Sequence, residues 1–103
     1  MASHTRQVLF LPGAKTYIDS MSGNDRGILA RDMEALAASE TGAIHIKLLE
    51  RPIYEMIVGH HRFTYFELRG RLYVVRGFRK KSAKTPKKEI QYAHQIYKIL
   101  HAQ

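Results

Sequence analysis

The chain contains no cysteine among its 103 residues, so it can form neither a disulfide framework nor a thiolate metal site. No segment approaches the roughly 18 apolar residues that a membrane span requires. The first residues, MASHTRQVLFLPGAK, hold too short an apolar stretch for a secretory signal. These absences predict a cytoplasmic protein without a membrane partner.

Several catalytic signatures are also absent. The sequence has no glycine-rich nucleotide loop and no serine in a nucleophile-elbow or triad context. Among its six histidines, His45, His94 and His101 do not have the spacing of a recognisable metal-ligand set. The sequence therefore predicts no metal and no cofactor.

The most prominent feature that is present is basic charge, and it is confined to one segment. The formal net charge is +8. Residues 1–58 hold 6 basic and 7 acidic side chains, residues 59–88 hold 10 and 1, and residues 89–103 hold one of each. A patch this dense repels itself and suits a polyanionic partner such as RNA, DNA or an acidic protein. A basic face that only contacts solvent is the alternative.

The order of expected elements indicates a single α+β domain over residues 1–103. An apolar run at 6–11 ends at Pro12-Gly13 and predicts a strand, and residues 14–21 predict a short helix. Ser22 or Asn24 can cap a longer helix from Asp25, which Gly42 is expected to end. Four short strands then follow at 44–49, 53–58, 62–68 and 71–78, the last two joined by a hairpin turn at 69–70.

A closing helix is expected after the basic segment. Thr85 suits its N-cap and Pro86 its first turn. One face of this helix should be apolar, formed by Ile90, Ala93, Tyr97 and Leu100.

Arg62 is the first candidate for a binding or catalytic residue. Strand alternation in RFTYFEL places Arg62, Thr64 and Phe66 on one face of the sheet. Helices must cover one face, so the opposite face can form an open, concave surface, and if Arg62 lies on that open face it points at whatever the sheet binds. The planar guanidinium fork of arginine donates paired hydrogen bonds to phosphate and keeps its proton. A strand arginine that merely faces solvent is the alternative.

The segment GFRKKSAKTPKKEI holds the densest charge, with six lysines and arginines in fourteen residues. Cations from Arg76 to Lys88 can surround a phosphate, and crowding of ammonium groups can lower the pKa of one lysine enough for acid-base work. Neighbouring cations would stabilise the phosphorane that forms when an RNA 2′-hydroxyl attacks its own phosphate. Plain electrostatic binding of RNA or DNA is the competing interpretation.

Two further positions near this segment are candidates. The His60-His61 pair precedes Arg62, and an imidazole there could shuttle a proton or simply be a polar turn residue. Tyr92 follows the basic segment on the expected last helix and could stack on a base.

Three pieces of the sequence resemble the HigB-like, phage-derived branch of the RelE/ParE toxin superfamily. IYEM resembles a strand that usually contains Leu-Tyr-Glu-Leu, and HRFTYF resembles Tyr-Arg-Val-x-Tyr-Phe. GFRKKSAKTPKKEI resembles a Gly-Phe-x-Lys-Lys-x-x-Lys-Thr-Pro run before the last helix. The resemblance covers residues 44–98 well and the first forty in outline.

The resemblance implies a RelE-like fold, in which strand, helix and helix precede a curved antiparallel sheet and a C-terminal helix. It implies a toxin of a type II toxin–antitoxin module that cuts mRNA on the ribosome without a metal. The partners would be ribosomal RNA, mRNA and a helix-turn-helix, HigA-like antitoxin. Arg62 would bind the scissile phosphate, with His61 as an acid-base candidate. The remaining roles would be phosphate contact and proton transfer by Lys80, Lys81 and Lys84, and RNA contact by Arg76, Arg79, Lys87, Lys88 and Tyr92.

The sequence departs from the family pattern in three places. Ile57 stands where an arginine usually follows the glutamate–leucine pair, and His61 stands where tyrosine is common. The C-terminal YKILHAQ lacks an Asp-Tyr-His site that some members carry. A gyrase inhibitor of the ParE type and a non-catalytic nucleic-acid-binding relative are therefore the alternatives.

Overall fold

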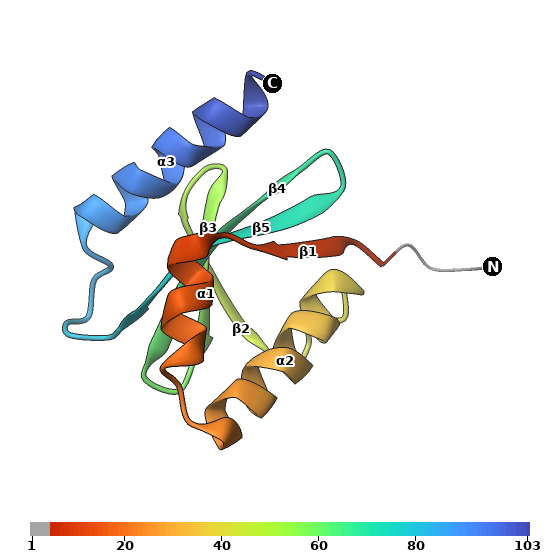
Figure 1. Cartoon of the computed structure of the whole chain (residues 1–103), viewed down its shortest axis with the longest axis vertical. Coiled ribbons are helices and arrows are strands. Elements are labelled where there is room, and N and C mark those ends of the chain that lie inside the picture. The colour runs from red at the N-terminus through yellow and green to blue at the C-terminus, as the bar shows by residue number, and fades with distance from the viewer. Residues whose placement is uncertain (1–4) are drawn as a thin grey trace.

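The computed structural model describes residues 5–103 and confirms the α+β class (Figure 1). Its eight elements follow the expected order. They are β1 (Gln7–Phe10), α1 (Pro12–Asp19), α2 (Gly23–Ala37), β2 (His45–Glu50), β3 (Ile53–Val58), β4 (His61–Leu68), β5 (Arg71–Arg79) and α3 (Lys87–His101).

The five strands form one mixed sheet in the order β1-β5-β4-β3-β2. Strands β2 to β5 make the expected antiparallel meander, and β1 adds to the edge of β5 in parallel. This parallel pair was not predicted, because its partners lie more than sixty residues apart and no local pattern links them. β1 pairs only with Arg71 to Val74, so the second half of β5 extends beyond it.

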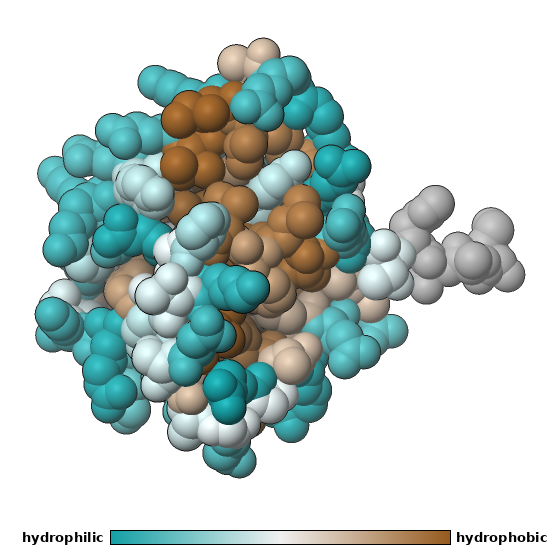
Figure 2. All heavy atoms as spheres, in the orientation of Figure 1, coloured by the Kyte–Doolittle hydropathy of each residue, from teal (hydrophilic) through white to brown (hydrophobic). Residues whose placement is uncertain are grey.

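Helices cover both faces of the sheet, which corrects the expectation of one fully open face. α1 and α2 pack on one face around Met33, Phe63 and Tyr65. α3 packs on the other face around Phe66 and Ala93. Figure 2 shows hydrophobic side chains in the middle of the viewed face and hydrophilic side chains around its rim. The predicted alternation along β4 is confirmed, because Phe63 and Tyr65 belong to the first core and Phe66 to the second.

A β-bulge in β5 decides which side chains reach the site. Thr64 pairs with Arg76 and Tyr65 pairs with Val74, so Val75 has no direct partner on β4. Val75 and Arg76 therefore both face α3, and Gly77 returns to the α1 face. Bulges re-aim side chains in this way because one extra residue shifts the two-residue alternation.

The predicted ends of the helices are partly confirmed. Ser22 caps α2, since its Oγ accepts a hydrogen bond from the Asp25 N–H at 3.1 Å. The expected stop at Gly42 is wrong, because α2 already ends at Ala37 and Ser39 adopts the left-handed conformation with φ 61°. The Glu40 N–H then donates to the Ala35 carbonyl and satisfies the last turn.

The start of α3 also differs from expectation. Pro86 occupies the N-cap position, and the Thr85 hydroxyl donates to the Glu55 carboxylate instead of capping the helix. Ala93 is buried and Tyr97 and Leu100 pack on the core as expected, but Glu89 rather than Ile90 is the buried residue of the first turn. The predicted hairpin turn is confirmed, with φ of 52° at Arg69 and 75° at Gly70. Within residues 5–103, no helix has the length and apolarity of a membrane span.

Candidate nucleic-acid site at the junction of β5 and α3

A pocket of about 430 Å³ opens where β5 leads through the basic loop, residues 80–86, into α3. Its walls come from Tyr17 of α1, Glu55 of β3, Arg62 of β4, the end of β5, the basic loop and the first turn of α3. Six of the lining residues are cations: Arg62, Arg79, Lys80, Lys81, Lys84 and Lys88. The junction that the sequence marked by charge is therefore a concave surface with a strongly positive wall.

Arg62 lies on the α3 face of the sheet, beyond the part that α3 covers. Its Nη1 donates to the carbonyl oxygens of Gly59 at 2.8 Å and His61 at 3.0 Å. These two bonds fix the guanidinium, and only 12% of the side chain is exposed. Among residues 5–103 its Nη2 donates no hydrogen bond, so that edge of the fork is available to a ligand.

Glu55 is a site residue that sequence reasoning did not single out as one. Its side chain is 4% exposed, and its Oε1 lies 4.0 Å from the Arg62 Nε. Its Oε2 accepts a bond of 2.6 Å from the Thr85 hydroxyl. Glu55 thus connects the end of the basic loop to the arginine of the sheet. Alternation along IYEMIV could have revealed it, because Glu55 is two residues from Ile53 of the α3-side core.

Ile57 lies directly across from Arg62 on the neighbouring strand. Because cross-strand partners point to the same face, an arginine at this position would stand beside Arg62 in the pocket wall. Ile57 itself is not among the pocket-lining residues, so the cross-strand neighbour of Arg62 at this position is an apolar side chain outside the pocket lining.

The lysines of the basic loop are exposed and surround the pocket mouth. The Lys80 N–H donates to the His60 carbonyl at 2.8 Å, and the Ser82 hydroxyl donates to the Lys84 carbonyl at 3.0 Å. These bonds hold the loop backbone while the ammonium groups stay in solvent. Lys80, Lys81, Lys84 and Lys88 line the pocket, whereas Lys87 lies outside its lining.

Arg76 and Tyr92 are engaged with each other outside the pocket lining. The Arg76 guanidinium carbon stands 4.7 Å from the centre of the Tyr92 ring, and its Nε lies 3.2 Å from Glu89 Oε1. The Arg76 side chain is 41% exposed, so it can still meet a bound backbone from the rim. The Tyr92 ring contributes its face to this arginine.

His61 points to the face opposite Arg62 and is 8% exposed. Its Nδ1 lies 2.6 Å from the Tyr17 hydroxyl and its Nε2 lies 2.9 Å from Asp25 Oδ2. Burial raises the pKa of the Tyr17 hydroxyl, although the nearby Arg79 guanidinium opposes the shift. The hydrogen bond from His61 lowers the pKa of Asp25. Sequence reasoning found His61 but missed Tyr17 and Asp25, which are 44 and 36 residues away in the chain.

His45 lies on the edge strand β2 and His94 lies on α3, and neither lines this pocket. Among residues 5–103, no three histidine, aspartate or glutamate side chains are grouped so that they could hold a metal ion. The acidic partner of His94 is Glu50, 3.0 Å away on β2.

The fold defined by these elements is that of the RelE toxins. A chain of a RelB–RelE antitoxin–toxin complex from Methanococcus jannaschii aligns with a TM-score of 0.61 at 16% identity, over 81% of this chain and 94% of that one. The isolated RelE toxin of E. coli aligns with a TM-score of 0.59 at 12% identity, over 84% and 97%. A chain of the toxin–antitoxin complex RelBE2 from Mycobacterium tuberculosis gives 0.60 at 14% identity, over 74% and 99%.

The sequence itself identifies the family. Residues 16–98 match the family described as Phage derived protein Gp49-like (DUF891), and the chain belongs to it. This confirms the resemblance to the phage-derived branch of the RelE superfamily. No curated protein matches the chain significantly.

Proposed function

We propose that this protein is the toxin of a toxin–antitoxin module and that it cuts mRNA on the translating ribosome. The observation that carries the proposal is the pocket in which Arg62 lies among five further cations. Such a pocket suits a sugar–phosphate backbone, since each phosphate can accept hydrogen bonds from several cations at once. The RelE fold and the phage-derived family support the same assignment.

In the proposed reaction the 2′-hydroxyl of one nucleotide attacks its own 3′-phosphate. Arg62 would bind the phosphate through the free edge of its guanidinium, and Lys80, Lys81 and Lys84 would balance the charge that grows on the phosphorane. Arg79, Lys87 and Lys88 would contact flanking RNA, with Arg76 at the rim. Charge stabilisation by these side chains can support the reaction without a metal ion.

The ribosome would supply the geometry that the pocket lacks. Cleavage requires the 2′-oxygen, the phosphorus and the leaving 5′-oxygen to lie in line, and free RNA rarely adopts that arrangement. A cationic pocket open to solvent binds RNA without imposing it. We therefore expect cleavage of mRNA in the decoding site and little cleavage of free RNA.

The proposed partner is an antitoxin encoded beside the toxin. Structural neighbours from Methanococcus jannaschii and Pyrococcus horikoshii are complexes of RelE with RelB. For the phage-derived branch we propose a helix-turn-helix, HigA-like antitoxin, and a cytoplasmic site of action on ribosomes.

The test is induced expression in a bacterial cell, with mRNA 5′ ends mapped against ribosome position. Wild-type protein should cut inside translated codons, and Arg62→Ala should abolish these cuts because the phosphate loses its fixed guanidinium. Arg31→Ala is the matched control, since its side chain is 76% exposed on α2 and lies outside the pocket lining.

Two other outcomes would contradict the proposal in different ways. Growth arrest with DNA damage and intact mRNA would indicate a gyrase inhibitor of the ParE type. Harmless expression would indicate a nucleic-acid-binding relative in which the loss of arginine at Ile57 has removed activity.

A further inference from the structure

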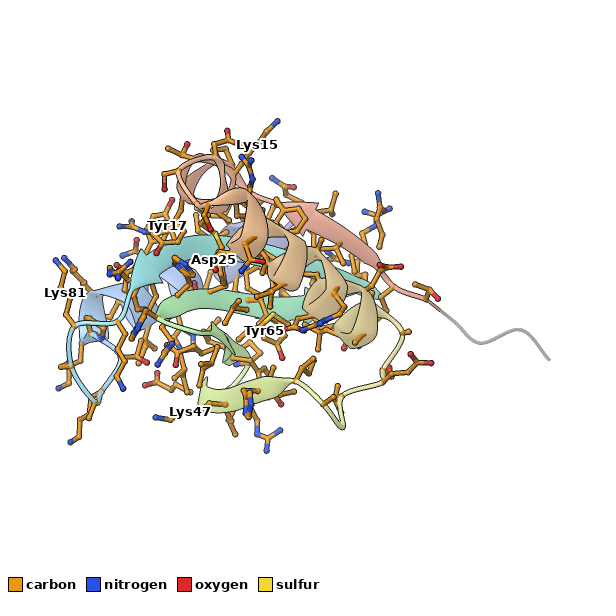
Figure 3. All side chains as sticks on the ribbon, turned by 90° about the horizontal axis from the view of Figure 1, so that it is seen from below. Lys15, Tyr17, Asp25, Lys47, Tyr65 and Lys81 are labelled. Carbon is orange, nitrogen blue, oxygen red and sulfur yellow. The ribbon has the colours of Figure 1, made fainter. Side chains whose placement is uncertain are left out.

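Three side chains from three different elements form one hydrogen-bonded row that ends at the pocket. Tyr17 comes from α1, His61 from β4 and Asp25 from the first turn of α2. Figure 3 shows Tyr17 and Asp25 side by side on the helix-covered face, with Lys81 on the loop that projects beyond them. Of the three, only Tyr17 lines the pocket.

The direction of the hydrogen bonds follows from the chemistry of the partners. An ionised Asp25 can only accept, so the His61 Nε2 carries the proton of their 2.9 Å bond. In the neutral imidazole the Nδ1 is then an acceptor, and the Tyr17 hydroxyl donates to it at 2.6 Å. The row is therefore ordered as phenol, imidazole and carboxylate, and a proton leaving Tyr17 would pass to His61 beside a negative charge.

The backbone fixes this row at its carboxylate end. The Asp25 N–H is held by the Ser22 hydroxyl, so the residue is anchored in the first turn of α2. Its carboxylate, 39% exposed, points to His61. At the other end the Tyr17 ring packs against Phe63, with ring centres 5.8 Å apart, and against the bare Cα of Gly77.

If Tyr17, His61 and Asp25 only stabilised the fold, their row of hydrogen bonds would not need to reach the pocket. Tyr17 shares the pocket wall with Arg79, whose charge acts on its hydroxyl, and with the cations of the basic loop. The Tyr17 oxygen keeps its lone pairs while its O–H donates a hydrogen bond to His61, and such lone pairs can accept a proton from a neighbouring hydroxyl.

We propose that Tyr17 is the catalytic general base of this ribonuclease, with His61 and Asp25 as the relay that receives and stabilises the proton. This inference rests on the function proposed above. It assigns the base to the α1 face of the sheet and leaves the cations to bind the phosphate.

The RNA 2′-oxygen forms a bond to phosphorus as its proton moves to the Tyr17 oxygen. The Tyr17 proton moves at the same time to His61 Nδ1, which gives an imidazolium paired with Asp25. The bond from phosphorus to the 5′-oxygen breaks, and a lysine of the basic loop protonates that oxygen. The products are a 2′,3′-cyclic phosphate and a 5′-hydroxyl. The imidazolium then gives its proton to solvent, and the neutral lysine takes up a proton from solvent.

The ionisation behaviour of the row agrees with a relay. Burial raises the pKa of Tyr17, so free phenolate would be scarce near neutrality and a phenol alone would be a poor base. Transfer of its proton to His61 within the same step avoids the phenolate. Asp25 stays ionised because its hydrogen bond with His61 lowers its pKa, and it can therefore stabilise the imidazolium.

The test is single-turnover cleavage of mRNA on programmed ribosomes by the full chain. Tyr17→Phe keeps the ring and removes only the hydroxyl, so the fold and ribosome binding should be retained even though the buried His61 Nδ1 loses its partner. The cleavage rate should fall by about 10²–10⁴-fold, the usual contribution of a positioned base. Tyr65→Phe is the matched control, because that hydroxyl lies under α2 in the first core, away from the pocket, and its loss should leave the rate unchanged (Figure 3).

Two further measurements separate a relay from a packing effect. His61→Asn and Asp25→Asn should slow cleavage, and either change made on top of Tyr17→Phe should slow it little further, since residues that act as one unit are not additive. A substrate with sulfur at the bridging 5′-position leaves without protonation. The Tyr17→Phe defect should persist on it if Tyr17 is the base.

Each contrary result identifies what has failed. Cleavage by Tyr17→Phe at the wild-type rate, additive losses, or rescue by the sulfur substrate would overturn the base assignment while the nuclease function stands. Absence of cleavage by the wild-type protein on ribosomes would refute the proposed function, and the base assignment with it.

Discussion

Gly77 lies against a ring of the hydrophobic core, Phe63, and against a ring of the pocket wall, Tyr17. A Cβ added at this residue would lie 2.5 Å from Tyr17 Cδ2, 2.8 Å from Tyr17 Cγ and 2.8 Å from Phe63 Cε1. Real Cβ atoms essentially never approach other atoms this closely. Both aromatic rings are packed, so neither can move without disturbing its neighbours. We therefore predict that Gly77→Ala destabilises the protein and displaces Tyr17.

The magnitude follows from two opposing effects. Overpacking a tight site costs about 1–3 kcal/mol. Alanine also restricts the unfolded chain, which returns about 0.4–1 kcal/mol. The free energy of unfolding should therefore fall by about 1–2 kcal/mol. For a domain of this size that corresponds to a melting temperature lower by roughly 5–15 °C.

The assay is denaturant unfolding of Gly77→Ala beside Gly27→Ala. Gly27 lies inside α2 with nothing within 4 Å of its added Cβ, so alanine there should stabilise the protein by about 0.5–1 kcal/mol. The two substitutions are chemically identical and should shift the midpoint in opposite directions. A Gly77→Ala protein as stable as the wild type would refute the argument that this glycine exists to admit the Tyr17 ring.

Salt and pH should act on the pocket cations, on Asp25 and on the buried phenol of Tyr65 in ways that can be measured. If all six pocket cations contact single-stranded RNA, a plot of the logarithm of the affinity against the logarithm of the salt concentration should have a slope of about −4. Lys84→Gln removes one cation and should make the slope less steep by about 0.7. The lowered pKa of Asp25 means that its contribution to stability is complete above its usual value of 3.8 and is lost as the pH falls through the lower folded value. The stability difference between wild type and Asp25→Asn should therefore shrink below pH 3.8 in acid unfolding. Burial raises the pKa of Tyr65 to about 12, so the folded state keeps this proton at pH values where the unfolded state has lost it. The free energy of unfolding should therefore fall as the pH rises from 10 towards 12. In thermal unfolding, Tyr65→Phe should remove this part of the loss of stability at alkaline pH.

The fold was predictable wherever the signal was local. Alternation along β4 set its two faces, Ser22 marked the start of α2, and the hairpin between β4 and β5 followed from the turn at Arg69-Gly70. The predictions failed where a tertiary contact decided the outcome. Thr85 has the chemistry of an N-cap, but the carboxylate of Glu55, thirty residues away, accepts its hydroxyl instead. Ser39 rather than Gly42 takes the left-handed position because α2 ends earlier, where Ala35 and Leu36 accept the bonds of its last turn.

The candidate site was predictable on its cationic side only. A run of basic residues is visible in the sequence, and most of it lines the pocket. The sequence could not show that Arg76 and Tyr92 lie outside the pocket lining and contact each other. The bulge at Val75 turns Arg76 towards α3, and the pattern of apolar residues does not predict this bulge. Tyr17 and Asp25 look like ordinary helix residues, and only packing brings them to His61.

The two halves of the site meet at the edge of β5 because β1 is short. β1 pairs with β5 only as far as Val74, and the chain then turns at Pro12 into α1. The rest of β5 is thereby free of a β1 neighbour, which lets α1 lay Tyr17 over Gly77 while the α3 face presents Arg62 and the loop cations. A longer first strand would cover this edge and separate the Tyr17 hydroxyl from the cations of the pocket. The length of β1 therefore determines which side chains can meet at this edge, although none of its residues lines the pocket.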